Sequence, residues 1–128
     1  MMKVFEIFPE IYNRCNHATD GIAHLFTSDS SYRKHFVAAI IVVALGVIAD
    51  LNVTEWTSII ICIGFVLVAE AFNSALEVLA DRVTNEYDVA VKLAKDIAAG
   101  AVFVSAITAL IVGLIIFVPK FITLIKNL

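Results

Sequence analysis

The chain has 128 residues, of which 61% are hydrophobic and only 16% are charged. A soluble domain is typically about 45–50% apolar and about 25% charged, so this composition argues against an ordinary soluble fold. The formal net charge of -3 also lacks the basic footprint of a nucleic-acid-binding protein, and we expect no nucleic-acid partner. The length allows one domain, and we expect a single all-α membrane domain over residues 1–128.

The first predicted element is an amphipathic helix over about residues 9–27. Pro9 suits the start of a helix. Apolar residues then recur at helical spacing, while charged residues and histidines occupy the opposite face. A helix of this kind beside a membrane span is expected to lie on the membrane surface. The polar segment 27–31 predicts a turn into the next helix.

Three apolar blocks predict transmembrane helices over about residues 34–51, 55–80 and 95–119. A helix needs about 20 apolar residues to cross a bilayer. The third block meets this length alone, and the first two meet it when their polar ends lie in the interface. Asn52 is expected in the turn between the first two spans, and Thr54 is expected to be the N-cap of the second.

The distribution of basic residues predicts the orientation of the chain. One group lies before the first span or between the second and third, namely Lys3, Arg14, Arg33, Lys34, Arg82, Lys92 and Lys95. Only Lys120 and Lys126 follow the third span. Because cytoplasmic segments are enriched in Lys and Arg, the N-terminus and the second loop are expected in the cytoplasm and the C-terminus outside.

The second span carries four polar residues on one face: Glu70, Asn73, Glu77 and Asp81. Their spacing places them within one quarter of the helix circumference. A helix end that emerges into water explains Asp81. It does not explain Glu70, because ionisable groups within a span are costly and usually functional. Carboxylates in this arrangement are typical ligands of Mg²⁺ or Ca²⁺, and a proton or cation path is the alternative interpretation.

Two segments resemble a known family. The sequence EAFNSALEVLADR at residues 70–82, followed by Glu86-Tyr87 and by KDIAAGAV at residues 95–102, resembles the bacterial integral-membrane diacylglycerol kinases, which include undecaprenol kinases. The resemblance implies a lipid kinase that transfers the γ-phosphate of Mg-ATP to the hydroxyl of diacylglycerol or undecaprenol. It also implies a homotrimer with active sites shared between subunits, in the bacterial cytoplasmic (inner) membrane.

The same resemblance implies roles for individual residues. Glu70 matches the catalytic acid that is proposed to take the proton from the lipid hydroxyl, and Asp29 and Glu77 match the metal ligands. The implied ATP-binding residues are His17, Asp29, Asn73, Glu77, Glu86, Tyr87, Asp88, Lys95 and Asp96, and the implied substrate-binding residues are Glu70, Ala99, Ser31 and His35.

Four positions depart from the pattern of the family. Asp29 stands where the family usually has Glu, and Glu10 stands where a basic residue is expected. His17 and Asp88 are not the usual residue types at their positions. These departures fall at the metal and nucleotide positions, so the implied contacts there differ in reach or in charge from those of the family.

The lipid acceptor is expected to be chosen by a groove between the first and third spans. Its walls are expected to include the small residues Ala38, Ala39, Val42, Gly46 and Gly113. Such a groove admits both lipids, while His35 and the KDIAAGAV segment resemble the undecaprenol kinases more closely. The alternative function is a non-enzymatic membrane subunit that uses the acidic helix face as a cation path or an assembly surface.

Overall fold

The structure is a computed structural model that describes residues 2–84 and 86–126, with side chains from Tyr12 onward. It contains α1 (Met2–Ser28), α2 (Ser30–Ile48), α3 (Val53–Val83) and α4 (Val89–Lys126). The last three helices are long and apolar enough to cross a membrane, which confirms the all-α architecture with three candidate spans. The side chain of Glu10 lies outside the described part of the chain.

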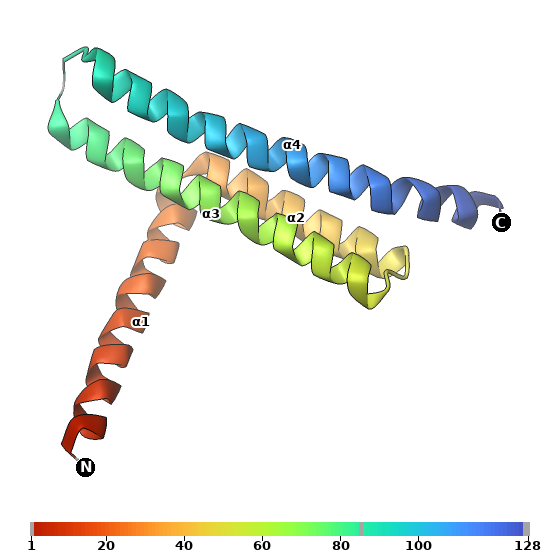
Figure 1. The fold of residues 1–128 in the computed structure, drawn as a ribbon, viewed down its shortest axis with the longest axis horizontal. Coiled ribbons are helices and arrows are strands. Elements are labelled where there is room, and N and C mark those ends of the chain that lie inside the picture. Colours follow the sequence, from red (N-terminus) through yellow and green to blue (C-terminus); the bar gives the residue numbers. More distant parts are fainter. Residues whose placement is uncertain (1, 85, 127–128) are drawn as a thin grey trace.

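The helices lie side by side except for α1 (Figure 1). Helix α3 is central: α4 runs along most of its length, and α2 runs beside its first half. Helix α1 leaves the start of α2 at a steep angle and points away from the other three. Its placement on a membrane surface stays a prediction.

The helix ends follow from capping side chains. The Asp29 Oδ1 atom accepts the backbone N–H groups of Ser31 and Tyr32, at 2.7 and 3.1 Å, so α2 begins at Ser30 rather than near residue 34. The Asp88 Oδ1 atom likewise accepts the N–H groups of Ala90 and Val91, at 2.8 and 3.0 Å. Because a capping carboxylate satisfies otherwise unpaired donors, α4 begins at Val89, before the predicted residue 95.

Helices α1 and α4 extend furthest beyond their predicted bounds. Helix α1 includes Met2–Ser28, with Pro9 inside it, whereas the predicted range was 9–27. Helix α4 continues through Pro119 to Lys126 rather than ending near residue 119. A proline removes one backbone donor, and transmembrane helices tolerate this loss because neighbouring groups compensate for it.

The prediction that Thr54 caps α3 is wrong, because Asn52 is the cap. The Asn52 side chain accepts the N–H groups of Thr54 and Glu55, at 2.9 and 3.0 Å, and the Glu55 carboxylate accepts the Asn52 N–H at 2.8 Å. This reciprocal pair is a capping box. The turn before it is closed by Asp50, whose φ of 49° is in the left-handed region that Asp tolerates better than most residues.

Few apolar side chains of the three long helices are buried. Ile59 is 2% exposed and Val66 is 8% exposed, and both lie on the central helix α3. In contrast, Phe65 and Phe72 of the same helix are each 70% exposed. An apolar surface of this extent requires lipid or other protein around it, in agreement with a membrane protein.

Gly46 allows α2 to approach α3 near the turn. A Cβ at this position would lie 2.8 Å from Cη2 of Trp56 and 3.1 Å from Cδ1 of Leu51. We therefore expect Gly46→Ala to lower the free energy of unfolding by about 1–3 kcal/mol, the usual cost of overpacking. Thermal unfolding in detergent micelles measures the loss. Gly64→Ala is the matched control, because nothing lies within 4 Å of a Cβ there. Equal melting temperatures for the two variants would contradict the prediction.

Candidate active site

Glu70 is the one charged residue that is buried among the described residues, with 4% of its surface exposed. It lies on α3, and its Oε1 atom is 2.8 Å from Nε2 of His35 on α2. Glu70 is also within electrostatic reach of Asp29 and Glu77. The structure thus brings the predicted catalytic acid into contact with a predicted substrate-binding residue.

Ser74 links this pair to the start of α2. Its hydroxyl donates to Oδ2 of Asp29, and it also lies 3.0 Å from the carbonyl oxygen of Glu70, one turn earlier. Ser74 is not among the residues that the sequence predicts for the site. The available signal was its position four residues after Glu70, on the same face of the helix.

The hydrogen bonds of Asp29 keep it ionised. Burial alone would raise the pKa of this carboxyl group. Hydrogen bonds from Ser74 and from the backbone N–H groups of Tyr32 and Ser31, with the nearby charge of Arg33, outweigh burial and lower the pKa below its ordinary value. The oxygen atoms of an ionised carboxylate can bind a cation or accept a hydrogen bond.

A polar pocket of about 770 Å³ lies between α1, the start of α2 and the second half of α3. Four of the predicted site residues line it: His17, Asp29, Ser31 and Glu77. Asp81 lines it as well. Three separate helices therefore contribute acids, histidines and hydroxyl groups to one cavity.

The remaining predicted nucleotide residues lie outside this pocket. Glu86 and Tyr87 are in the connection between α3 and α4, where Tyr87 is 79% exposed. Asp88 caps α4, and Asp96 pairs with Lys92 on the same helix. One chain by itself does not bring these side chains into the polar pocket.

Three further predicted residues lie around α4. Lys95 donates to Oδ1 of Asp81 at 3.0 Å, so it reaches the edge of the polar pocket through that acid. Asn73 lines a different cavity, between α3 and α4. Its Nδ2 donates to Oε1 of Glu77 at 3.0 Å, and its Oδ1 is buried without a partner among the described residues. Ala99 is exposed on α4 and lines neither the polar pocket nor the apolar groove described below.

The carboxylates of the polar pocket are few in number. The side chains of residues 12–84 and 86–126 include no group of three or more His, Cys, Asp or Glu placed to hold a metal ion. Mg²⁺ usually takes one or two carboxylates and completes its coordination with water and substrate phosphates. Asp29 and Glu77, which line the same pocket, fit that smaller donor set.

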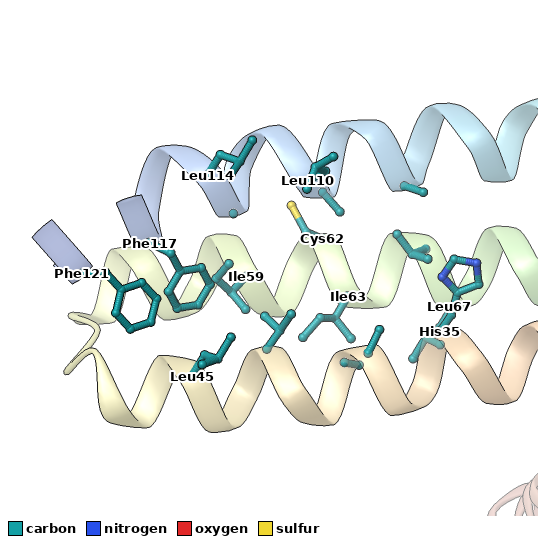
Figure 2. Close-up of a pocket in the computed structure, with 17 residues that line it drawn as sticks. His35, Leu45, Ile59, Cys62, Ile63, Leu67, Leu110, Leu114, Phe117 and Phe121 are labelled. Atoms are coloured by element: carbon teal, nitrogen blue, oxygen red, sulfur yellow. The ribbon is translucent and has the colours of Figure 1, made fainter. Parts of the chain in front are cut away.

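An apolar groove with a volume of about 350 Å³ lies between α2, α3 and α4 (Figure 2). His35 lies at one end of it, and Phe117 and Phe121 lie at the other end. Ala38, Ala39, Val42 and Gly113 line it as predicted. Gly46 does not, and this part of the prediction is wrong because Gly46 is buried against Trp56.

Glu70 connects the apolar groove with the polar pocket. Through His35 it meets the end of the apolar groove, and through its own carbonyl and Ser74 it meets the Asp29 side of the polar pocket. A buried acid in this place can accept a proton from a polar group whose apolar remainder fills the groove.

Comparison with known proteins identifies the family of the chain. The sequence profile described as prokaryotic diacylglycerol kinase matches residues 16–117. The undecaprenol kinase of Bacillus subtilis (strain 168) is 38% identical over 104 residues, which cover 81% of this chain and 85% of the relative. The diacylglycerol kinase of Synechocystis sp. is 28% identical over 121 residues, which cover 94% of this chain and 69% of the relative. The diacylglycerol kinase of Escherichia coli (strain K12) is 26% identical over 104 residues, covering 81% and 85%.

The profile match covers most of the chain, including both spans that supply Glu70 and its partner His35. The relatives are kinases, and the three long apolar helices place the protein in a bacterial membrane. The non-enzymatic alternative is therefore set aside, and the chain belongs to the prokaryotic diacylglycerol kinase family as a membrane lipid kinase.

Proposed function

We propose that the protein transfers the γ-phosphate of ATP to the hydroxyl of a membrane lipid alcohol, either undecaprenol or diacylglycerol. The products are undecaprenyl phosphate or phosphatidic acid, together with ADP. The observation that carries this proposal is the position of buried Glu70 between an apolar groove and a polar pocket. The groove suits a lipid chain, and the pocket suits a charged nucleotide.

The proposed reaction begins with the lipid hydroxyl at the end of the groove that His35 lines. Glu70 accepts the proton of this hydroxyl, and the hydroxyl oxygen forms a bond to the γ-phosphorus while the bond to ADP breaks. Phosphoryl transfer depends chiefly on positioning and on charge neutralisation. Asp29 and Glu77 would hold Mg²⁺, which neutralises phosphate charge when it is bound.

We also propose that the enzyme is a homotrimer with active sites shared between subunits. In this arrangement a neighbouring subunit supplies residues that one chain leaves apart: Glu86, Tyr87, Asp88, Asp96 and Ala99. The large exposed apolar side chains of α3, such as Phe65 and Phe72, support an interface on this helix. The unpartnered Oδ1 atom of Asn73 supports it as well, because a buried polar atom without a partner is costly.

The orientation follows from the same proposal. ATP is a cytoplasmic substrate, so the polar pocket, α1 and the connection between α3 and α4 would face the cytoplasm. The turn between α2 and α3 and the C-terminus would lie outside. The concentration of basic residues on the proposed cytoplasmic side supports this orientation.

We expect phosphorylation of both lipids, with a modest preference for undecaprenol. The small groove residues Ala38, Ala39 and Gly113 admit an isoprenoid or two acyl chains, and the 38% identity to an undecaprenol kinase favours the isoprenoid. Thin-layer chromatography after incubation with Mg-ATP, with both lipids in the same mixed micelles, tests this directly. A preference for diacylglycerol above about a hundredfold, or ~2.7 kcal/mol in transition-state binding, would contradict the preference but not the kinase activity. If neither lipid gave a phosphorylated product, the proposed function would be contradicted.

A further inference from the structure

The proposed mechanism leaves one contact of the catalytic acid without a role. His35 projects from α2 at the end of the apolar groove, where its side chain is 32% exposed, and its Nε2 atom faces Oε1 of Glu70 at 2.8 Å. Among the described residues, His35 is the one hydrogen-bond partner of the Glu70 carboxylate. The other carboxylate oxygen, Oε2, accepts no hydrogen bond from them.

We propose that His35 is a positioning residue for phosphoryl transfer. Its Nε2–H donates to Oε1 of Glu70 and holds the carboxylate at the end of the groove. Oε2 is then the atom left to accept the hydrogen of the acceptor hydroxyl. This inference rests on the proposed function. It assigns His35 the role of orienting the general base Glu70, in addition to the predicted contact with substrate.

The surroundings of Glu70 show why such an anchor matters. A glutamate side chain has three rotatable bonds, and a buried carboxylate that lacks a donor loses the hydrogen bonds it would have in water. Asp29 and Glu77 are also negatively charged and act on Glu70 across the site. Without His35, the carboxylate would lack this donor, and rotamers that turn it towards water and away from the end of the groove would be favoured.

Two matched amide substitutions separate positioning from other roles. In His35→Gln, the amide N–H can take the place of the imidazole Nε2–H, whereas the side chain in His35→Asn is one methylene shorter and cannot reach Glu70. We expect His35→Asn to lower kcat by about 10–100-fold, the scale of a misplacement by about 1 Å. The KM for ATP should stay unchanged, and His35→Gln should retain most of the wild-type kcat. The full chain is assayed in mixed micelles with undecaprenol and Mg-ATP.

The outcomes distinguish the alternatives. A wild-type kcat in His35→Asn would overturn the inference. A rise in the KM for lipid that is equal in both variants, with kcat unchanged, would also overturn it, because His35 would then be a lipid contact only. Thermal unfolding checks that both variants fold. If His35→Asn does not fold, His35→Leu takes its place, because its apolar side chain suits the groove lining.

A second background tests the contact itself. The shortened side chain of Glu70→Asp cannot reach His35, so adding His35→Asn to it should lower kcat by less than about twofold, as expected for residues that act as a unit. Equal losses in the two backgrounds would overturn the inference. Lack of wild-type activity on both lipids would instead overturn the proposed function, and the two failures are therefore distinguishable.

Discussion

Replacing Glu70 with Gln is expected to remove measurable lipid phosphorylation while the protein still folds and binds nucleotide. The amide has nearly the shape of the carboxylate but cannot accept a proton from the acceptor hydroxyl. Loss of a general base lowers turnover by about 10²–10⁴-fold. Folding should survive, because an uncharged amide is less costly to bury than a carboxylate and its oxygen can still accept from Nε2 of His35.

The measurement is the initial rate of phosphate transfer from labelled ATP at saturating lipid, with nucleotide binding followed separately by a fluorescent ATP analogue. Glu55→Gln is the matched control, because it makes the same chemical change on the same helix. Glu55 lies at the turn, where it pairs with Lys120 at 3.0 Å. We expect the control to keep its activity. Near-normal turnover in Glu70→Gln would remove Glu70 from the catalytic role.

The unusual position of Glu70 within an apolar span could be predicted from sequence, but its contact with His35 could not. An acid that interrupts an apolar span is visible in the sequence alone, since burial of charge requires a reason. Its contact with His35 depends on how α2 and α3 are placed along each other, and periodicity within one helix does not determine that offset. The same limit explains why Ser74 could not be predicted as a site residue, since its hydrogen bond to Asp29 joins residues 45 positions apart.

Local signals located most of the fold, and the wrong predictions at Thr54 and Gly46 have different causes. Apolar length predicted the three long helices. Asn52 followed three residues later by Glu55 is a capping box, so the sequence itself contains the signal for a cap at Asn52, two residues before the predicted Thr54. Gly46 was expected in the groove because it is small, but the ring of Trp56 occupies the space above it. Whether a small residue leaves room or is covered depends on a neighbour in another helix.

Asp29 has two roles that a pair of substitutions can separate. It caps α2 through Oδ1, and it is a proposed metal ligand in the polar pocket. Asn caps helices as well as Asp does, so Asp29→Asn should keep the cap and lose the charge. Asp29→Ala should lose both, and its free energy of unfolding should fall by a further ~0.5–2 kcal/mol.

The dependence of stability on pH provides a check on the charge. Because hydrogen bonds lower the pKa of folded Asp29, its ionised form stabilises the fold above the ordinary pKa of an aspartate. This contribution is lost as the pH falls through the lowered pKa. Thermal unfolding measured across the acid range should therefore show a smaller decline for Asp29→Asn than for the wild type.

The metal requirement should change in Asp29→Asn and in the corresponding variant Glu77→Gln. Both carboxylates line one pocket and are proposed to hold the same ion with the phosphates. Each variant should raise the Mg²⁺ concentration for half-maximal activity by about tenfold or more, equivalent to ~1.4 kcal/mol. Titration of Mg²⁺ at constant ATP measures the shift. Asp50→Asn, at the turn between α2 and α3, should leave the Mg²⁺ dependence unchanged. If both pocket variants matched this control, the proposed metal site would be wrong, because two removed charges would have had no effect on the cation that they are meant to hold.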